Sequence, residues 1–131
     1  MTHYTGADFY ATFGGTPISG EQTDFTDNEE GGLAEATAGA DTDATYVGTY
    51  KTGSATMVTL AVVGTTTIYD ACVPLTAGTL IYGPEGTVAG KPKYTVDAIV
   101  TSRSRSLPFA GIAVYTIGFT FNSAKTDGTY P

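Results

Sequence analysis

The alternating pattern of residues 112–122 restricts the fold of this chain more than any other feature. Every second position carries an apolar residue, in most cases a large one: Ala113, Tyr115, Ile117, Phe119 and Phe121. Because successive side chains of a β-strand point to opposite faces, these side chains share one face. The pattern predicts a strand with one buried aromatic face, which is the firmest part of the predicted core.

Threonine and glycine are frequent, at 25 and 17 of 131 residues. β-branched residues favour strands, and glycine favours tight turns. Residues 8–19 predict a hairpin, because Gly14-Gly15 supplies the positive φ angles that a two-residue turn needs. Residues 54–63, 79–82 and 94–105 predict three further strands.

The remaining segments predict little regular structure. Residues 66–76 predict one short helix that begins at a threonine cap. Residues 20–32 are acidic and predict a loop or a short edge strand, and residues 124–131 predict a flexible tail. Residues 39–53 predict a mobile, exposed loop, because loops of this length in a compact domain are usually functional or disordered.

These elements predict an all-β fold for one domain that spans residues 1–131. We expect an antiparallel β-sandwich or barrel of about seven or eight strands with one short flanking α-helix. The chain length agrees with the common domain size of roughly 100–150 residues.

The formal net charge of −7 lies almost entirely in the first half of the chain. Residues 1–65 hold nine acidic residues and one basic residue, whereas residues 66–131 hold four acidic and five basic residues. Tight nucleic-acid binding requires clustered lysine and arginine, so this composition argues against it. An acidic end can stack against a complementary neighbour, and a solvated acidic face that aids solubility is the open alternative.

The residues needed for catalysis or metal binding are scarce. His3 is the only histidine and lies at the N-terminus, where chain ends are usually frayed, so a catalytic triad is not expected. Cys72 is the only cysteine, which excludes an internal disulfide and leaves too few ligands for zinc. We therefore expect no enzyme activity, no catalytic residue, no metal site and no cofactor.

Targeting signals are also not evident. The first residues lack the basic start and apolar run of a signal peptide, and no apolar stretch approaches the roughly 20 residues of a membrane span. These features predict folding in a cytoplasm without a membrane partner.

Several motifs, taken in their order along the chain, resemble those of the tail tube proteins of long-tailed bacteriophages. The matching segments are Thr5-Gly6-Ala7-Asp8-Phe9-Tyr10 with the Phe-Gly-Gly hairpin, Tyr82-Gly83-Pro84-Glu85-Gly86-Thr87 with Gly90-Lys91-Pro92, Ala98-Ile99-Val100-Thr101-Ser102-Arg103, and Ser106-Leu107-Pro108. The resemblance spans nearly the whole chain, and its weight lies in the order and spacing of the motifs.

The resemblance implies a structural virion protein that assembles in the host cytoplasm. Copies would form hexameric rings that stack on a tape-measure protein, with a tail terminator and baseplate or tail-tip proteins as further partners. The resulting tube is a conduit for genome delivery, in which DNA passes through the lumen without specific binding. One sheet would line the lumen, and the loop 39–53 would reach the adjacent ring.

Three groups of residues are candidates for these contacts. The inter-ring contact candidates are Asp41, Asp43, Tyr46, Tyr50 and Lys51. The acidic candidates for the lumen are Asp8, Asp24, Glu29, Glu30 and Asp97. The candidates for subunit contacts are Arg103 and Arg105, which we expect on the same strand face as Asp97 and Ile99.

Two alternatives remain open at this point. A capsid decoration or tail-terminator protein would share the β-rich, acidic and threonine-rich composition. A β-sandwich module that binds carbohydrate or a cell surface would use Tyr46, Tyr50 and Tyr82 as an aromatic platform, although the chain has no tryptophan.

Overall fold

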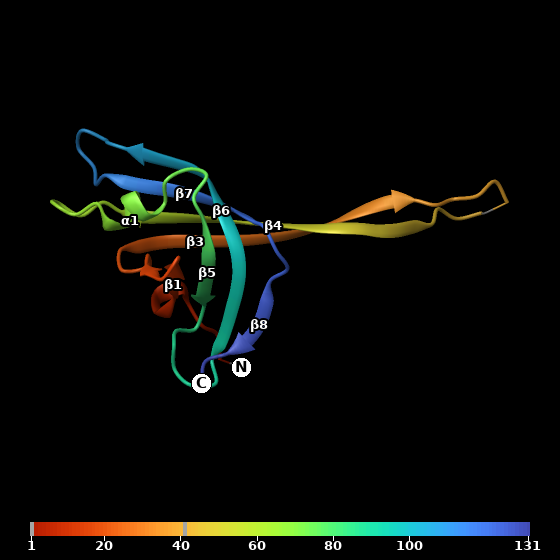
Figure 1. Cartoon of the computed structure of the whole chain (residues 1–131), viewed down its shortest axis with the longest axis horizontal. Coiled ribbons are helices and arrows are strands. Elements are labelled where there is room, and N and C mark those ends of the chain that lie inside the picture. The colour runs from red at the N-terminus through yellow and green to blue at the C-terminus, as the bar shows by residue number, and fades with distance from the viewer. Residues whose placement is uncertain (1, 41) are drawn as a thin grey trace.

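Eight strands form one hydrogen-bonded sheet in the structure, a computed structural model that describes residues 2–40 and 42–131. The strands follow the order β2-β1-β5-β6-β7-β4-β3, all neighbours are antiparallel, and β8 pairs with β6 outside this path (Figure 1). The elements are the 3-10 helix η1 (Gly6–Asp8), β1 (Tyr10–Phe13), β2 (Thr16–Pro17), β3 (Gln22–Glu35), β4 (Tyr46–Leu60), α1 (Thr67–Ala71), β5 (Ala77–Gly83), β6 (Pro92–Ser106), β7 (Val114–Phe121) and β8 (Thr126–Thr129). The predicted antiparallel all-β class with one short α-helix is confirmed.

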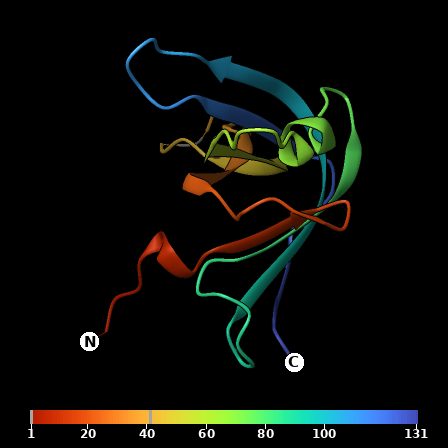
Figure 2. The same cartoon turned by 90° about the vertical axis from the view of Figure 1, so that its left-hand side faces the viewer.

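The sheet curls so that its two ends approach each other around the core (Figure 2). Aromatic side chains bring these ends together. The ring of Phe25 in β3 lies 4.5 Å from the ring of Phe9, which directly precedes β1, and 5.1 Å from the ring of Tyr82 in β5. The fold is therefore an open barrel, and we call the line where β3 meets the β1 end of the sheet the seam.

Buried apolar side chains from both parts of the curled sheet form the core. Phe119 of β7 packs against Phe13 of β1, with ring centroids 5.1 Å apart. The alternation predicted for residues 112–122 is confirmed, because Tyr115, Ile117 and Phe119 are all buried. Burying one large apolar side chain contributes roughly 1.5–3 kcal/mol, so this row supplies a substantial part of the stability.

For residues 20–32 the predicted edge strand is confirmed but is not short, and the loop predicted at 39–53 is wrong over its second half. β3 crosses the first segment as a 14-residue strand, and β4 begins at Tyr46 inside the second. The two strands pair from Gln22↔Thr59 to Glu35↔Tyr46. The outer part of this hairpin is exposed on both faces, so its sequence lacks the alternation that marks a half-buried strand.

The C-terminal segment forms a strand where the sequence predicts a flexible tail. β8 pairs with the first residues of β6, from Thr129↔Pro92 to Thr126↔Thr95. Beyond β8, the backbone N–H of Tyr130 donates to the carbonyl of Lys91 over 3.0 Å. The end of the chain is thereby attached to the sheet.

The predicted helix is confirmed but is shorter than its pattern suggests. α1 has five residues and begins after Thr66, whose hydroxyl donates to Asp70 Oδ2 over 2.7 Å. Across residues 2–40 and 42–131, no helical segment combines the length and apolar composition that crossing a bilayer would demand.

Gly83 is a position where packing requires glycine. A Cβ atom there would lie 2.7 Å from the carbonyl oxygen of Gly86 and 2.7 Å from the ring of Tyr130. Because the backbone oxygen cannot move aside easily, we expect Gly83→Ala to lower the free energy of unfolding by about 1–3 kcal/mol.

Gly48→Ala is the matched control, because a Cβ at this strand position meets nothing within 4 Å. We expect its effect to stay within about 0.5 kcal/mol. Urea denaturation followed by circular dichroism measures both variants, and equal stabilities would contradict the packing argument.

Candidate assembly surfaces

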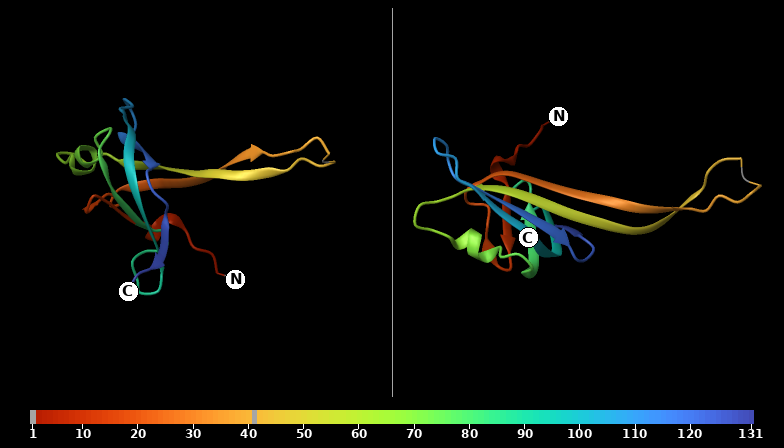
Figure 3. Two further views of the ribbon diagram at one scale, coloured as in Figure 1. Left: turned by 45° about the vertical axis from the view of Figure 1, so that its right-hand side comes forward. Right: turned by 90° about the horizontal axis from the view of Figure 1, so that it is seen from above.

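The outer part of the β3–β4 hairpin extends far beyond the rest of the fold (Figures 1 and 3). β7 pairs with β4 from Ser54 to Leu60, so among the described residues the rest of β4 has only β3 as a neighbouring strand. We call residues 30–52 the arm. An isolated two-stranded hairpin is marginally stable in water, so contact with a further surface would stabilise the arm.

Both faces of the arm carry exposed aromatic or aliphatic side chains. Leu33 lies opposite Gly48, which alternation places on the same face as Tyr46. A register shift between Gly31 and Leu33 puts Tyr50 on the other face, where its ring lies beside Gly32. The exposed fractions are 58% for Tyr46, 68% for Tyr50 and 69% for Leu33. We call these three residues the apolar arm residues. An exposed group of this kind on a narrow ribbon is typical of a protein-binding surface.

The other predicted inter-ring residues lie at different places on the arm. Backbone and hydroxyl hydrogen bonds between residues 36–37 and Thr45 close the tip, where Asp43 is exposed. Lys51 is exposed and lies opposite Gly31, on the same face of the arm as Tyr46 and Leu33. Asp41 lies outside the described residues.

Three of the predicted lumen carboxylates share the outer face of the sheet. Residues directly opposite each other on antiparallel strands lie on the same face. One such row crosses β6, β7, β4 and β3 through Ile99, Thr120, Ser54 and Asn28. Alternation then places Asp97, Glu30 and Asp24 on this face.

The same outer face carries many hydroxyl groups. Alternation and pairing assign to it Thr26, Ser54, Thr56, Ser102, Ser104, Thr116 and Thr120. We call this surface the hydroxyl face. Its carboxylates are partly engaged, since the Thr79 hydroxyl donates to Asp97 Oδ1 over 3.2 Å and Asn28 Nδ2 donates to Glu30 Oε1 over 3.1 Å.

The remaining two acidic candidates lie elsewhere. Asp8 belongs to η1, and Glu29 points to the inner side, where its Oε1 lies 2.6 Å from Lys125 Nζ. Burial of Lys125 disfavours its charge, but the hydrogen bond and attraction from Glu29 outweigh that cost and raise the pKa of the lysine. This ion pair ties the segment before β8 to the base of the arm.

Arg103 and Arg105 were predicted to lie on the same strand face as Asp97 and Ile99. This prediction is wrong, because the pairing of β6 with β7 shifts register between Val100 and Ser102. Beyond the shift, Arg103 lies opposite Ile117 and Arg105 opposite Tyr115, both of which point inward. A bulge of this kind reverses which side chains face the core.

Both arginines hold α1 against the sheet. Arg103 Nη1 donates to the carbonyl of Tyr69 over 2.9 Å, and its guanidinium lies 3.8 Å from the centre of the Tyr69 ring. Arg105 lies 4.3 Å from the same ring centre. Cation–π contacts of this kind contribute about 0.5–2 kcal/mol each. The arginines therefore have a structural role within the subunit, and a role between subunits stays a prediction.

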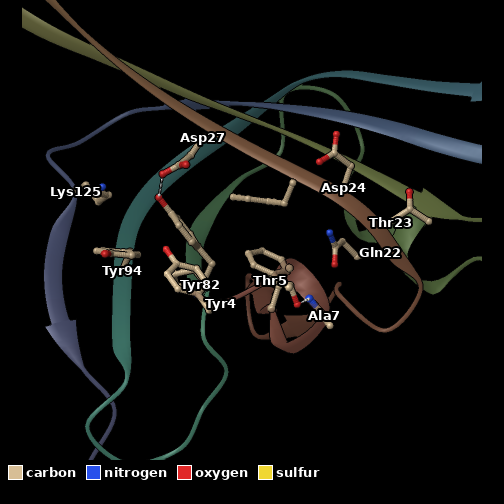
Figure 4. Close-up of a pocket in the computed structure, with 14 residues that line it drawn as sticks. Tyr4, Thr5, Ala7, Gln22, Thr23, Asp24, Asp27, Tyr82, Tyr94 and Lys125 are labelled. Atoms are coloured by element: carbon tan, nitrogen blue, oxygen red, sulfur yellow. Dashed lines mark hydrogen bonds between the residues drawn. The ribbon is translucent and has the colours of Figure 1, made fainter. Parts of the chain in front are cut away.

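An open groove follows the seam (Figure 4). Its volume is about 760 Å³, and η1, the start of β3, β5 and the start of β6 line it. Tyr4, Phe9, Phe25, Tyr82 and Tyr94 contribute its aromatic wall. The sequence gives no local signal for this seam groove, because its walls come from segments far apart in the chain.

The seam groove has an acidic border. Asp24 and Asp27 both line it, and the Tyr82 hydroxyl donates to Asp27 Oδ2 over 2.7 Å. Burial, together with this hydrogen bond, raises the pKa of Tyr82 far above its ordinary value, so the phenol stays a donor. Because Tyr82 is 2% exposed, it cannot form the predicted aromatic platform with Tyr46 and Tyr50.

Cys72 lies in the core directly after α1 and is fully buried. Burial raises the pKa of its thiol to about 11, although the nearby positive charge of Arg103 opposes the shift. Within the described ranges, no group of three or more His, Cys, Asp or Glu side chains is placed to hold a metal ion.

Comparison with known proteins identifies structural relatives only. The sequence matches no protein-family model and no curated protein. A chain in the tail of an empty gene transfer agent particle with C6 symmetry superposes with a TM-score of 0.75 at 10% identity, covering 97% of this chain and 100% of that chain. The SPP1 tail tube gives a TM-score of 0.71 at 15% identity, covering 95% of this chain and 78% of that chain. This chain shares their fold.

The cap of the anti-feeding prophage, described as a tube-terminating cap, has the same fold. Its TM-score is 0.74 at 15% identity, and the match covers 98% of this chain and 93% of that chain. At the level of the fold, the resemblance to tail tube proteins stated from the sequence is therefore confirmed.

The hydrogen bond between Tyr82 and Asp27 provides a test of how the seam is held. We expect Tyr82→Phe to lower the free energy of unfolding by about 1–2 kcal/mol, because a hydrogen bond to a charged group is lost. Tyr10→Phe is the control, since the Tyr10 hydroxyl makes no hydrogen bond among the described residues. Thermal and urea unfolding measure both, and an equal effect would contradict the proposed contribution.

The pKa of Cys72 gives a second prediction. A thiol with a pKa of about 11 is almost wholly protonated at pH 8, and the thiolate is the reactive form. We therefore expect slow reaction with Ellman's reagent in the folded protein and fast reaction in denaturant. Fast, stoichiometric labelling of the folded chain at pH 8 would contradict the burial of this side chain.

Proposed function

We propose that this chain is a structural, non-catalytic subunit of a phage-type tail tube. Residues 1–131 would act as one domain, and copies of it would form rings, expected to be hexameric, that stack into a hollow tube. The observation that carries the proposal is the arm, which projects from the sheet with no further strand of residues 2–40 and 42–131 on its outer edges.

The arm supports a role in assembly for a physical reason. Two paired strands outside the core bury little apolar surface and are marginally stable alone. Their free edges offer unpaired N–H and C=O groups to another chain, and the apolar arm residues offer apolar area on both faces. A surface that reaches from one copy to a different site on the next copy is heterologous, and such contacts generate rings or filaments.

The hydroxyl face is the proposed lining of the lumen. Neutral hydroxyl groups together with Asp24, Glu30 and Asp97 would not hold DNA phosphates, because phosphate binding requires clustered cations. DNA would then pass through the tube without specific binding. Asp8 and Glu29 are less suited to this role, because they lie off this face.

The motif resemblance suggests the remaining partners and the place of action, and the relatives include chains from terminator and baseplate structures. A tape-measure protein, a tail terminator and baseplate or tail-tip proteins are the proposed partners in addition to further copies of this chain. The proposed location is the tail of a phage-like particle, after assembly in the host cytoplasm.

A tail terminator is the second candidate, and the similarity to the tube-terminating cap of the anti-feeding prophage favours it. A terminator closes one end of a tube and does not polymerise alone. Negative-stain electron microscopy of the concentrated, purified protein separates the two functions. Long tubes support a tube subunit, whereas single rings that cap preformed tubes support a terminator.

Shortening the arm tests the proposed function directly. In this variant, residues 32–50 are replaced by Asn-Gly, which joins Gly31 to Lys51. Gly31 and Lys51 are directly paired across the hairpin. Asn-Gly favours the two-residue turn that such a pair requires. The core strands are untouched, so we expect a folded protein with a nearly unchanged melting temperature. We expect no tubes, because the surface that reaches the neighbouring copy is missing.

A second variant retains the arm and removes only its apolar contacts. Tyr46→Thr combined with Tyr50→Thr keeps residues with high strand propensity, so the hairpin should still form. We expect the concentration required for assembly to rise about tenfold or more, measured by sedimentation against the unmodified protein. Normal tubes from the shortened protein would overturn the role of the arm.

A further inference from the structure

The loop between β6 and β7 presents an unusually exposed aromatic side chain. Phe109 has a relative exposure of 107%, and the flanking Leu107 and Ile112 are exposed by 70% and 66%. The loop is compact, because a Cβ atom at Gly111 would lie 2.9 Å from Pro108 Cγ. A compact turn of this kind limits the backbone freedom that the loop loses on binding.

The seam groove is the surface of this chain that suits such a ring. Its wall contains several aromatic side chains, and Phe9, Phe25 and Tyr82 already pack with ring centroids 4.5–6.4 Å apart. A further ring can therefore extend an existing aromatic cluster. An aromatic side chain buries roughly 150–250 Å², and a groove of about 760 Å³ has room for it.

We infer that the β6–β7 loop of one copy inserts Phe109 into the seam groove of another copy. This inference rests on the proposed function, because it assigns one contact of the proposed assembly. It names a complementary pair of surfaces, a loop that carries Phe109 and an aromatic groove at the seam. Because the two surfaces differ, the contact is heterologous and repeats from copy to copy.

The positions of the two surfaces suit a repeating contact. Both surfaces lie on the body, away from the arm, with the β6–β7 loop at its top and η1, which borders the seam groove, at its lower side (Figures 1 and 2). Each copy can therefore insert its loop into one neighbour and receive the loop of another neighbour. Only the copies at the ends of the assembly keep one surface unoccupied. Insertion within one copy is excluded by the same separation.

Charge complementarity selects this loop over the tip of the arm as the occupant. Asp24 and Asp27 border the seam groove, where Lys125 is already paired with Glu29. Arg105 stands at the base of the β6–β7 loop and remains exposed while it stacks on Tyr69. The tip of the arm carries Asp43, and β3 ends at Glu35 next to the tip. Insertion of the tip into the groove would therefore place negative charges close to Asp24 and Asp27. Like charges placed together oppose a contact, whereas opposite charges favour its register.

One phenyl ring does not form a stable interface by itself, since specific interfaces bury roughly 1,200–2,000 Å². Phe109 therefore acts as a central anchor, and the arm supplies further area. Buried aromatic residues are the most common anchors of protein interfaces.

Site-directed cross-linking tests the contact. Phe109→Cys is combined with Ala7→Cys, because Ala7 is exposed and lines the seam groove (Figure 4), and the buried Cys72 is left in place. After treatment with a short bismaleimide, we expect a ladder of multiples of the chain mass on a denaturing gel. Each single variant should remain monomeric, and a mixture of the two single variants should give dimers.

Val63→Cys combined with Ala7→Cys is the matched control, because Val63 is fully exposed on a different loop. Equal ladders from both double variants, or tubes without any cross-link, would overturn the assignment while leaving the tube proposal intact. A specific ladder without tubes would support the contact and overturn the tube. Absence of both cross-links and assemblies would overturn both proposals.

A substitution gives an independent readout. We expect Phe109→Ser to raise the concentration required for assembly by about tenfold or more, because a buried phenyl ring is lost from the interface. Val63→Ser removes a comparably exposed apolar side chain and should cause no such shift. An equal shift in both variants would overturn the specific role of Phe109, and circular dichroism verifies that both remain folded.

Discussion

The contact of Phe25 with Phe9 and Tyr82 is the interaction on which the rest of the structure depends. It closes the curled sheet through side chains, so β3 keeps a backbone edge that is free of strand pairing. A barrel closed by hydrogen bonds would have no such edge and no groove at the seam. The same contact fixes where β3 leaves the body, and with it the direction of the arm. Core, groove and arm therefore follow from one aromatic cluster.

The sequence predicted those strands of which one face is buried. In β7, Tyr115, Ile117 and Phe119 alternate with small or polar residues, and the class, the first hairpin and the late strands followed from that signal. The outer halves of β3 and β4 carry no such signal, because water reaches both faces and only backbone pairing defines the strands. Alternation of apolar and polar residues arises where one face of a strand is buried. The sequence pattern therefore predicts a loop for a hairpin that extends beyond the core.

The candidate surfaces were predictable only in part. Tyr46 and Tyr50 were predicted as contact residues and are exposed, on opposite faces of the arm, although the segment that carries them was predicted to be a loop. The register shift after Val100 has no clear sequence signature, and it reverses the side on which Arg103 and Arg105 lie. The seam groove depends on tertiary proximity of η1, β3 and β5, which no local pattern encodes. The resemblance to tail tube proteins lay in motif order, and it led to the fold that the structural relatives confirm.

The arm leaves the body as a continuation of β3 and β4, and the strands stay paired through the register shift between Gly31 and Leu33. Tension applied at its tip would therefore pass along two hydrogen-bonded backbones into β7 and the core. A polymer tied together by such arms would resist stretching and bending as a stiff rod. The rigidity of the assembly would then originate in the strand pairing of each subunit.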